Sequence, residues 1–125
     1  MSADLFIIAK TWLPWILIFI LTNATNEELL YRGLFLRKLE PLYGKLFSNL
    51  LIVLVFTALH VGVTYSQDQL VLLVLLIPLA FAWGYITQKT QSLLGSILFH
   101  AEMDISIILG IFSNLPNSYL IFKLM

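Results

Sequence analysis

The stretch NEELLYRGLF, residues 26–35, places two acidic residues and an arginine inside an apolar segment. Glu28 and Arg32 are four positions apart, so in a helix they share one face, with the acid N-terminal, an order that favours an ion pair. Glu27 is rotated by about 100° from Glu28 and is left free. The stretch therefore predicts a helix that carries one internal charge pair and one available carboxylate among apolar residues.

The composition around this stretch is that of a membrane protein. Of 125 residues, 60% are hydrophobic and 11% are charged, and the mean hydropathy is +0.94, values outside the range of soluble domains. The net charge is zero, which gives no electrostatic basis for binding nucleic acid. The chain has no cysteine, which excludes disulfides, thiolate catalysis and cysteine metal ligands.

Four apolar segments predict an all-α, polytopic bundle of transmembrane helices in a single domain over residues 1–125. They cover about residues 5–36, 46–63, 70–87 and 93–112. In the first segment, Thr25 and Glu28 form a capping box that would suit a tight helical hairpin. Residues 26–36 are too few to cross a bilayer as a second span, so one long helix, kinked at Pro14, is expected instead. The N-terminus lacks the basic flank and cleavage site of a signal peptide, so this helix is expected to be retained.

Two polar turns, over residues 37–45 and 88–92, are expected to leave the membrane on the same side. They contain Arg37, Lys38, Lys45 and Lys89, whereas the turn between the second and third spans has only Asp68. The positive-inside rule then predicts a multi-pass protein whose basic turns are cytoplasmic.

The remaining ionisable residues lie within the apolar spans, where each costs about 2.5–3.5 kcal/mol. They are Glu27, Glu28, Arg32, His60, His100, Glu102 and Asp104. At about 1.5 Å per helical residue, counted from the basic turns, Glu27, His60, His100 and Asp104 fall about 15–22 Å deep, in one layer. His100 and Asp104 share a helix face, and Glu102 points away from it. Carboxylates beside imidazoles in a dry cavity can take a proton from water, directly or through a bound metal.

Some aromatic and small residues are expected to have structural roles. Trp12, Trp15, Tyr31 and Trp83 are expected to be interface anchors or packing groups. Gly33, Gly84 and Gly95 are expected to allow close helix contact.

Three motifs in this order carry a resemblance to a known family. Glu27-Glu28-x-x-x-Arg32, then Phe56-x-x-x-His60, then His100-x-x-x-Asp104 resemble the signature of the CPBP intramembrane proteases. This family takes in type II CAAX prenyl endopeptidases and the bacterial Abi proteins, which are linked to bacteriocin processing or immunity. The resemblance covers about residues 10–112.

The resemblance implies an intramembrane endopeptidase that hydrolyses a peptide bond of a hydrophobic or lipid-modified, CAAX-like substrate. Its catalytic set is Glu27, Glu28, His60, His100 and Asp104. Glu27 would be the general base, His60 its partner, and His100 with Asp104 the oxyanion side. Arg32 would hold Glu28. Further expected partners are membrane lipid and other membrane-protein subunits.

Two departures from the family pattern leave alternatives open. The third motif can end in Asn or Asp, and an ionised Asp104 accepts hydrogen bonds but cannot donate one to an oxyanion. Asp104 would then be protonated, orient His100, or join Glu27, His60 and His100 in binding a divalent metal such as zinc. The chain also lacks the extra spans of many relatives. The alternative function is therefore a catalytically silent structural or immunity protein that binds another membrane protein or complex.

Overall fold

The computed structural model describes residues 3–62 and 69–113, and within these ranges the chain is helical without any strand. The helices are α1 (Ala3–Glu28), η1 (Leu29–Leu36), α2 (Arg37–Tyr43), α3 (Lys45–Leu59), α4 (Gln69–Thr90) and α5 (Leu94–Ser113). The all-α prediction is confirmed.

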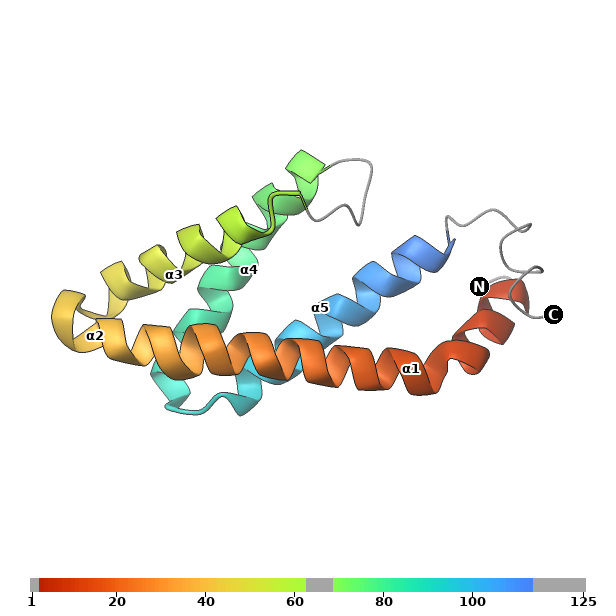
Figure 1. The fold of residues 1–125 in the computed structure, drawn as a ribbon, viewed down its shortest axis with the longest axis horizontal. Helices are drawn as coiled ribbons and strands as arrows, with labels where there is room; N and C mark the ends of the chain where they lie inside the picture. Colours follow the sequence, from red (N-terminus) through yellow and green to blue (C-terminus); the bar gives the residue numbers. More distant parts are fainter. Residues whose placement is uncertain (1–2, 63–68, 114–125) are drawn as a thin grey trace.

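The first three helices form one continuous rod, as Figure 1 shows. The prediction of one long helix is thus confirmed and the hairpin is not formed. The η1 segment is a π-helix, a rare form that is frequently found at functional sites. The prediction of a turn over residues 37–45 is wrong for most of its length, because α2 continues to Tyr43 despite Pro41. The chain reverses only at Gly44, whose φ of 78° favours glycine.

The other helices differ from their predicted ranges at the ends. Helix α3 ends at Leu59, and His60 to Gly62 form a turn, so the predicted second span is shorter than expected. Helix α4 continues to Thr90, three residues into the predicted turn, and the chain then reverses at Gln91, which has a φ of 54°.

Two apolar clusters hold the helices together in pairs. Helix α1 packs on α5 around Ile16, Ile20, Ala24, Ala101 and Ile108. Helix α3 packs on α4 around Val53, Phe56, Leu76, Ala80 and Trp83. Helices α4 and α5 also pack together, and η1 contacts both α3 and α4, which brings the two pairs into one bundle (Figure 1).

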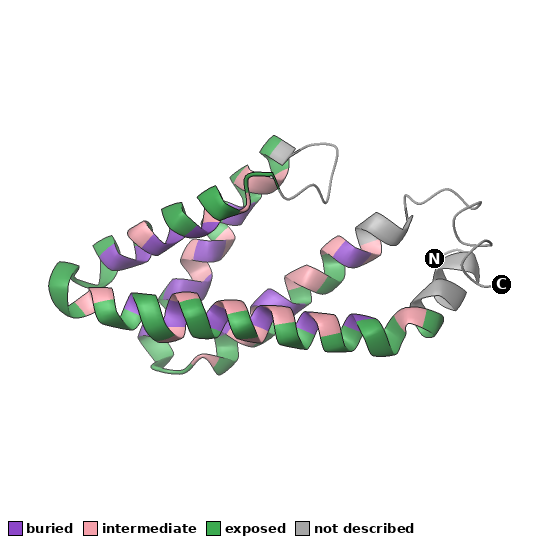
Figure 2. Cartoon of the chain, in the orientation of Figure 1, coloured by how far each residue is buried: buried purple, intermediate pink, exposed green. Residues whose placement is uncertain are grey.

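The exterior of the bundle is apolar while its interior holds polar groups. Many large apolar side chains are exposed, among them Trp15, Ile18, Leu54, Leu70 and Val74, and exposed residues cover the outer faces in Figure 2. The buried polar residues are Glu28, Arg32, Ser48, Asn49, Thr87, Gln88, Ser96 and His100. Among the described helices, one segment, Leu70–Thr90, is both long and apolar enough to cross a membrane, and the apolar helix Lys45–Leu59 is shorter.

The two basic segments lie next to each other at one end of the bundle. Nη2 of Arg37 donates to the carbonyl of Gln91 at 3.4 Å, and Nε2 of Gln88 donates to the carbonyl of Lys45 at 2.8 Å. The two basic segments are therefore neighbours in the bundle, and the side of the membrane that they face stays a prediction.

Candidate functional site

A buried ion pair anchors the site to the helix bundle. Nη1 of Arg32 lies 2.9 Å from Oε1 of Glu28, and both side chains are fully buried. Nη2 of the same guanidinium donates to the carbonyl oxygen of Ala80 on α4 at 2.9 Å. The planar guanidinium fork therefore ties the π-helical segment to α4, which a lysine cannot do with the same geometry. The predicted pairing of Glu28 with Arg32 is confirmed.

The same carboxylate also positions the imidazole of His100. Nδ1 of His100 lies 2.9 Å from Oε1 of Glu28. Because Oε1 belongs to a carboxylate that accepts hydrogen bonds, Nδ1 carries the proton and Nε2 is left for other partners. The ring also stacks on Trp83, with centroids 4.1 Å apart and planes 12° from parallel. Glu28 and Trp83 together fix the orientation of His100.

Glu27 lacks the two short contacts that Oε1 of Glu28 makes with Arg32 and His100, although Oε2 of each glutamate is buried without a hydrogen-bond partner. Oε2 of Glu27 lies 3.6 Å from Nε2 of His100, too far for a strong bond. The side chain is 27% exposed, compared with 0% for Glu28. The two adjacent glutamates therefore have different environments, as the sequence predicts.

Asp104 belongs to the same polar layer through two neighbours. Its Oδ1 lies 3.7 Å from Nε2 of His100, and its Oδ2 accepts a hydrogen bond from Nδ2 of Asn23 at 3.1 Å. Helices α1 and α5 are thus joined by a polar contact as well as by their apolar cluster.

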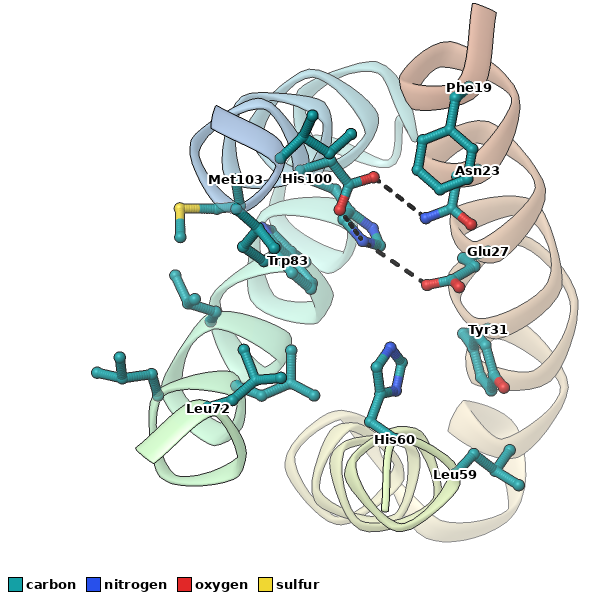
Figure 3. Close-up of a pocket in the computed structure, with 16 residues that line it drawn as sticks. Phe19, Asn23, Glu27, Tyr31, Leu59, His60, Leu72, Trp83, His100 and Met103 are labelled. Atoms are coloured by element: carbon teal, nitrogen blue, oxygen red, sulfur yellow. Dashed lines mark hydrogen bonds and ion pairs between the residues drawn. The ribbon is translucent and has the colours of Figure 1, made fainter. Parts of the chain in front are cut away.

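His60 faces this layer from the C-terminal end of α3. Its Nδ1 lies 2.8 Å from the carbonyl oxygen of Phe56. A carbonyl oxygen can only accept a hydrogen bond, so Nδ1 carries the hydrogen and Nε2 is the available nitrogen in the neutral ring. Figure 3 shows the ring pointing across the cavity toward Glu27.

Glu27, His60, His100 and Asp104 line one cavity of about 360 Å³. Its polar wall consists of Asn23, Glu27, Tyr31, His60, His100 and Asp104, with Trp83 beside them. Its remaining wall is apolar and consists of Phe19, Leu59, Leu72, Leu75, Leu76, Leu79, Met103, Ile107 and Ile108. Such a cavity, with a few convergent polar groups on an apolar lining, has the form of a ligand site.

The structure brings together the residues that the sequence predicts in one layer. Glu27, His60, His100 and Asp104 line the cavity, Glu28 lies behind His100, and Glu102 is exposed on the opposite face of α5.

Sequence reasoning missed Asn23 as a member of the site, although it lies one helical turn before Glu27 and so on the same face. Trp83, expected to be an interface anchor or packing group, is a buried packing group that also stacks on His100.

A divalent metal would need three or more of these side chains around one point. Within the described residues, no group of three or more His, Asp or Glu side chains is placed to hold a metal ion. The predicted metal set of Glu27, His60, His100 and Asp104 lines the cavity, and metal binding by these residues stays a prediction.

Comparison with known protein families matches residues 9–106, most of the chain. The matching family is described as type II CAAX prenyl endopeptidase Rce1-like, a family of membrane-associated proteases. Neither the comparison with curated proteins nor that with solved structures gave a match. The matched region contains all three motifs of the predicted signature, so the chain belongs to the type II CAAX prenyl endopeptidase Rce1-like family.

Proposed function

We propose that this protein is an intramembrane endopeptidase in which Glu27 and His60 activate a water molecule. The observation that carries the proposal is that Glu27 and His60 line the same cavity, and that Oε2 of Glu27 is buried there without a hydrogen-bond partner. A buried carboxylate oxygen without a partner is costly unless a water or a substrate group satisfies it.

Two hydrogen-bond acceptors on one cavity can hold a water in a reactive orientation. The water would donate one O–H to Oε2 of Glu27 and the other to Nε2 of His60, which leaves an oxygen lone pair for the scissile carbonyl carbon. Glu27 would take the proton as the C–O bond forms and return it to the leaving amine. His60 would orient the water, since its Nδ1 proton is held by the Phe56 carbonyl.

His100 and Asp104 form the opposite side of the proposed site. In its imidazolium form, His100 presents an Nε2–H, which can stabilise negative charge on the carbonyl oxygen. Glu28 supports this role because it fixes the ring through Nδ1, and Arg32 holds Glu28.

The distribution of apolar and ionisable residues in the bundle supports a reaction within the membrane. Its exposed surface is rich in large apolar side chains, and its ionisable groups are gathered inside, the distribution expected for a lipid-embedded protein. We therefore propose a multi-pass arrangement with the basic ends of α2, α3 and α4 on the cytoplasmic side.

The proposed substrate is a hydrophobic or prenylated peptide. The leucine-rich wall formed by α4 and the end of α3 gives an apolar surface next to the polar layer, where a lipid-modified segment can lie beside the scissile bond. The family, described as type II CAAX prenyl endopeptidase, supports this proposal.

The test uses the purified full-length protein in lipid nanodiscs with an internally quenched farnesylated CAAX peptide. The wild type should cleave it, and Glu27→Gln and His60→Ala should each lower kcat by about 100-fold or more, the usual effect of removing a general base or its partner. Glu102→Gln, which changes an exposed carboxylate on the opposite face of α5, should keep the wild-type rate. Equal rates for Glu27→Gln and the wild type would disprove the proposed role of Glu27. Absence of cleavage together with stable capture of another membrane protein would favour the structural or immunity role instead.

A further inference from the structure

Asn23 places an amide group on the wall of the cavity. It lies four residues before Glu27 on α1, and both residues line the cavity with His100 and Asp104. Figure 3 shows its side chain pointing inward above Glu27. Its Nδ2 donates to Oδ2 of Asp104 at 3.1 Å. The carboxylate accepts hydrogen bonds, so this contact assigns the nitrogen, and not the oxygen, of the amide to the side of Asp104.

This contact uses only one of the two N–H groups of the amide. An asparagine NH₂ carries two hydrogens, and no other hydrogen bond is made by this amide among the described side chains. The second N–H is therefore available to a group inside the cavity.

Asp104 has the opposite property, because an ionised carboxylate has no hydrogen to give. Oδ1 of Asp104 faces Nε2 of His100 at 3.7 Å and Oδ2 is occupied by Asn23. The α5 side of the polar layer thus offers His100 as its donor to a developing negative charge, and Asn23 on α1 adds an amide to the same cavity wall.

From this geometry we infer that Asn23 is a catalytic residue that donates a hydrogen bond to the oxyanion, and that Asp104 is the positioning residue that orients the Asn23 amide. The inference rests on the proposed function. When the water oxygen bonds to the scissile carbon, the carbonyl π pair moves to the oxygen and the water proton moves to Glu27. The second N–H of Asn23 and the Nε2–H of His100 bind that oxygen. When the C=O bond re-forms, the C–N bond breaks and Glu27 gives its proton to the amine.

The test compares kcat and KM of Asn23→Leu with those of Asn26→Leu in nanodiscs, with the same quenched farnesylated peptide. Leucine keeps the branched shape of asparagine, though it is somewhat larger, and is compatible with an apolar bundle, and Asn26 is an exposed asparagine on the same helix. Asn23→Leu should lower kcat by about 100-fold while KM changes by less than about threefold, because the lost contact exists only in the transition state. Asn26→Leu should leave both constants unchanged. If Asn23→Leu folds poorly, Asn23→Ala carries the same expectation, with rates expressed per folded molecule.

The variant Asp104→Asn distinguishes two roles for Asn23. Asn23 is either a direct donor to the oxyanion or a residue that only positions Asp104. This variant removes the negative charge and adds a second amide, so kcat should rise. Asn23→Leu in this background should cost less than about tenfold, because the new amide on α5 can donate instead. If Asp104→Asn lowers kcat as much as Asn23→Leu does, or if Asn23→Leu keeps the wild-type kcat, the inference is wrong. In either case cleavage by the wild type and its loss in Glu27→Gln still support the proposed function. If the wild type does not cleave, the proposed function fails and the inference fails with it.

Discussion

Nδ1 of His100 lies 2.9 Å from Oε1 of Glu28, although the two residues are 72 positions apart in the sequence. The same oxygen lies 2.9 Å from Nη1 of Arg32. One buried carboxylate therefore holds both the guanidinium that connects η1 to α4 and the imidazole that faces the cavity. Loss of this carboxylate should affect stability and the orientation of His100 together.

Replacement of Glu28 by alanine is expected to destabilise the protein strongly. The change leaves a fully buried guanidinium and a buried imidazole without their shared acceptor, a loss that typically costs about 3–5 kcal/mol. Unfolding in mixed micelles with increasing denaturing detergent measures the cost. The matched control is Glu102→Ala, since Glu102 is an exposed acid on α5, and it should change the free energy of unfolding by less than about 0.5 kcal/mol. Similar losses for both variants would contradict the anchoring role of Glu28.

Close packing between α3 and α4 at Gly84 gives a second expectation. A Cβ at this position would overlap the side chain of Asn49, whose amide donates to the carbonyl of Phe81. Gly84→Ala should therefore lower the stability by about 1–3 kcal/mol through overpacking. Thermal unfolding in nanodiscs is the measurement.

Gly33→Ala is the control for this effect. A Cβ there meets the end of the Leu93 side chain at 3.1 Å, which can shift, and alanine favours a helix over glycine by about 1 kcal/mol. Gly33→Ala should therefore leave stability nearly unchanged. If Gly33→Ala lowers the stability more than Gly84→Ala does, the expectation that a Cβ is tolerated better at Gly33 than at Gly84 is wrong.

Much of this fold could be predicted from the sequence because the strongest signals in it are local. The long apolar runs predict the helices, and the i,i+4 spacing of Glu28 and Arg32 predicts their pairing. Counting along each helix places Glu27, His60 and His100 in one layer, since a helix has a fixed rise per residue.

The parts that could not be predicted depend on contacts between helices or on weak local signals. The π-helical form of η1 has no sequence pattern that distinguishes it from an α-helix, and α2 continues where Pro41 and charged residues suggest a turn. The bond between Asn23 and Asp104 spans 81 positions, and only the relative rotation of α1 and α5 brings these side chains together. The i,i+4 spacing of Asn23 and Glu27 was the one signal that would have included Asn23.

Chelation is expected to leave the proposed activity intact. In the proposed mechanism the water is held by Glu27 and His60, which both line the cavity, and no step uses a metal ion. Incubation with 1,10-phenanthroline, followed by the nanodisc cleavage assay and metal analysis, checks this. Inhibition that is reversed by adding zinc would instead support the metal-dependent alternative, with Glu27, His60, His100 and Asp104 as the ligand set.

The two adjacent glutamates should respond in opposite ways to the same isosteric change. Oε2 of Glu27 lies 3.6 Å from Nε2 of His100, a longer contact than the two of Glu28, so Glu27→Gln removes a poorly compensated buried charge and should keep or raise the stability while it lowers kcat by about 100-fold or more. Glu28→Gln removes the charge that holds Arg32 and His100 and should lower the stability by about 2–4 kcal/mol. Melting temperatures and cleavage rates, measured on the same samples, give both values for each variant. If both glutamates had only structural roles, both substitutions would lower the stability of the protein. A large destabilisation by Glu27→Gln would therefore contradict the catalytic role of Glu27.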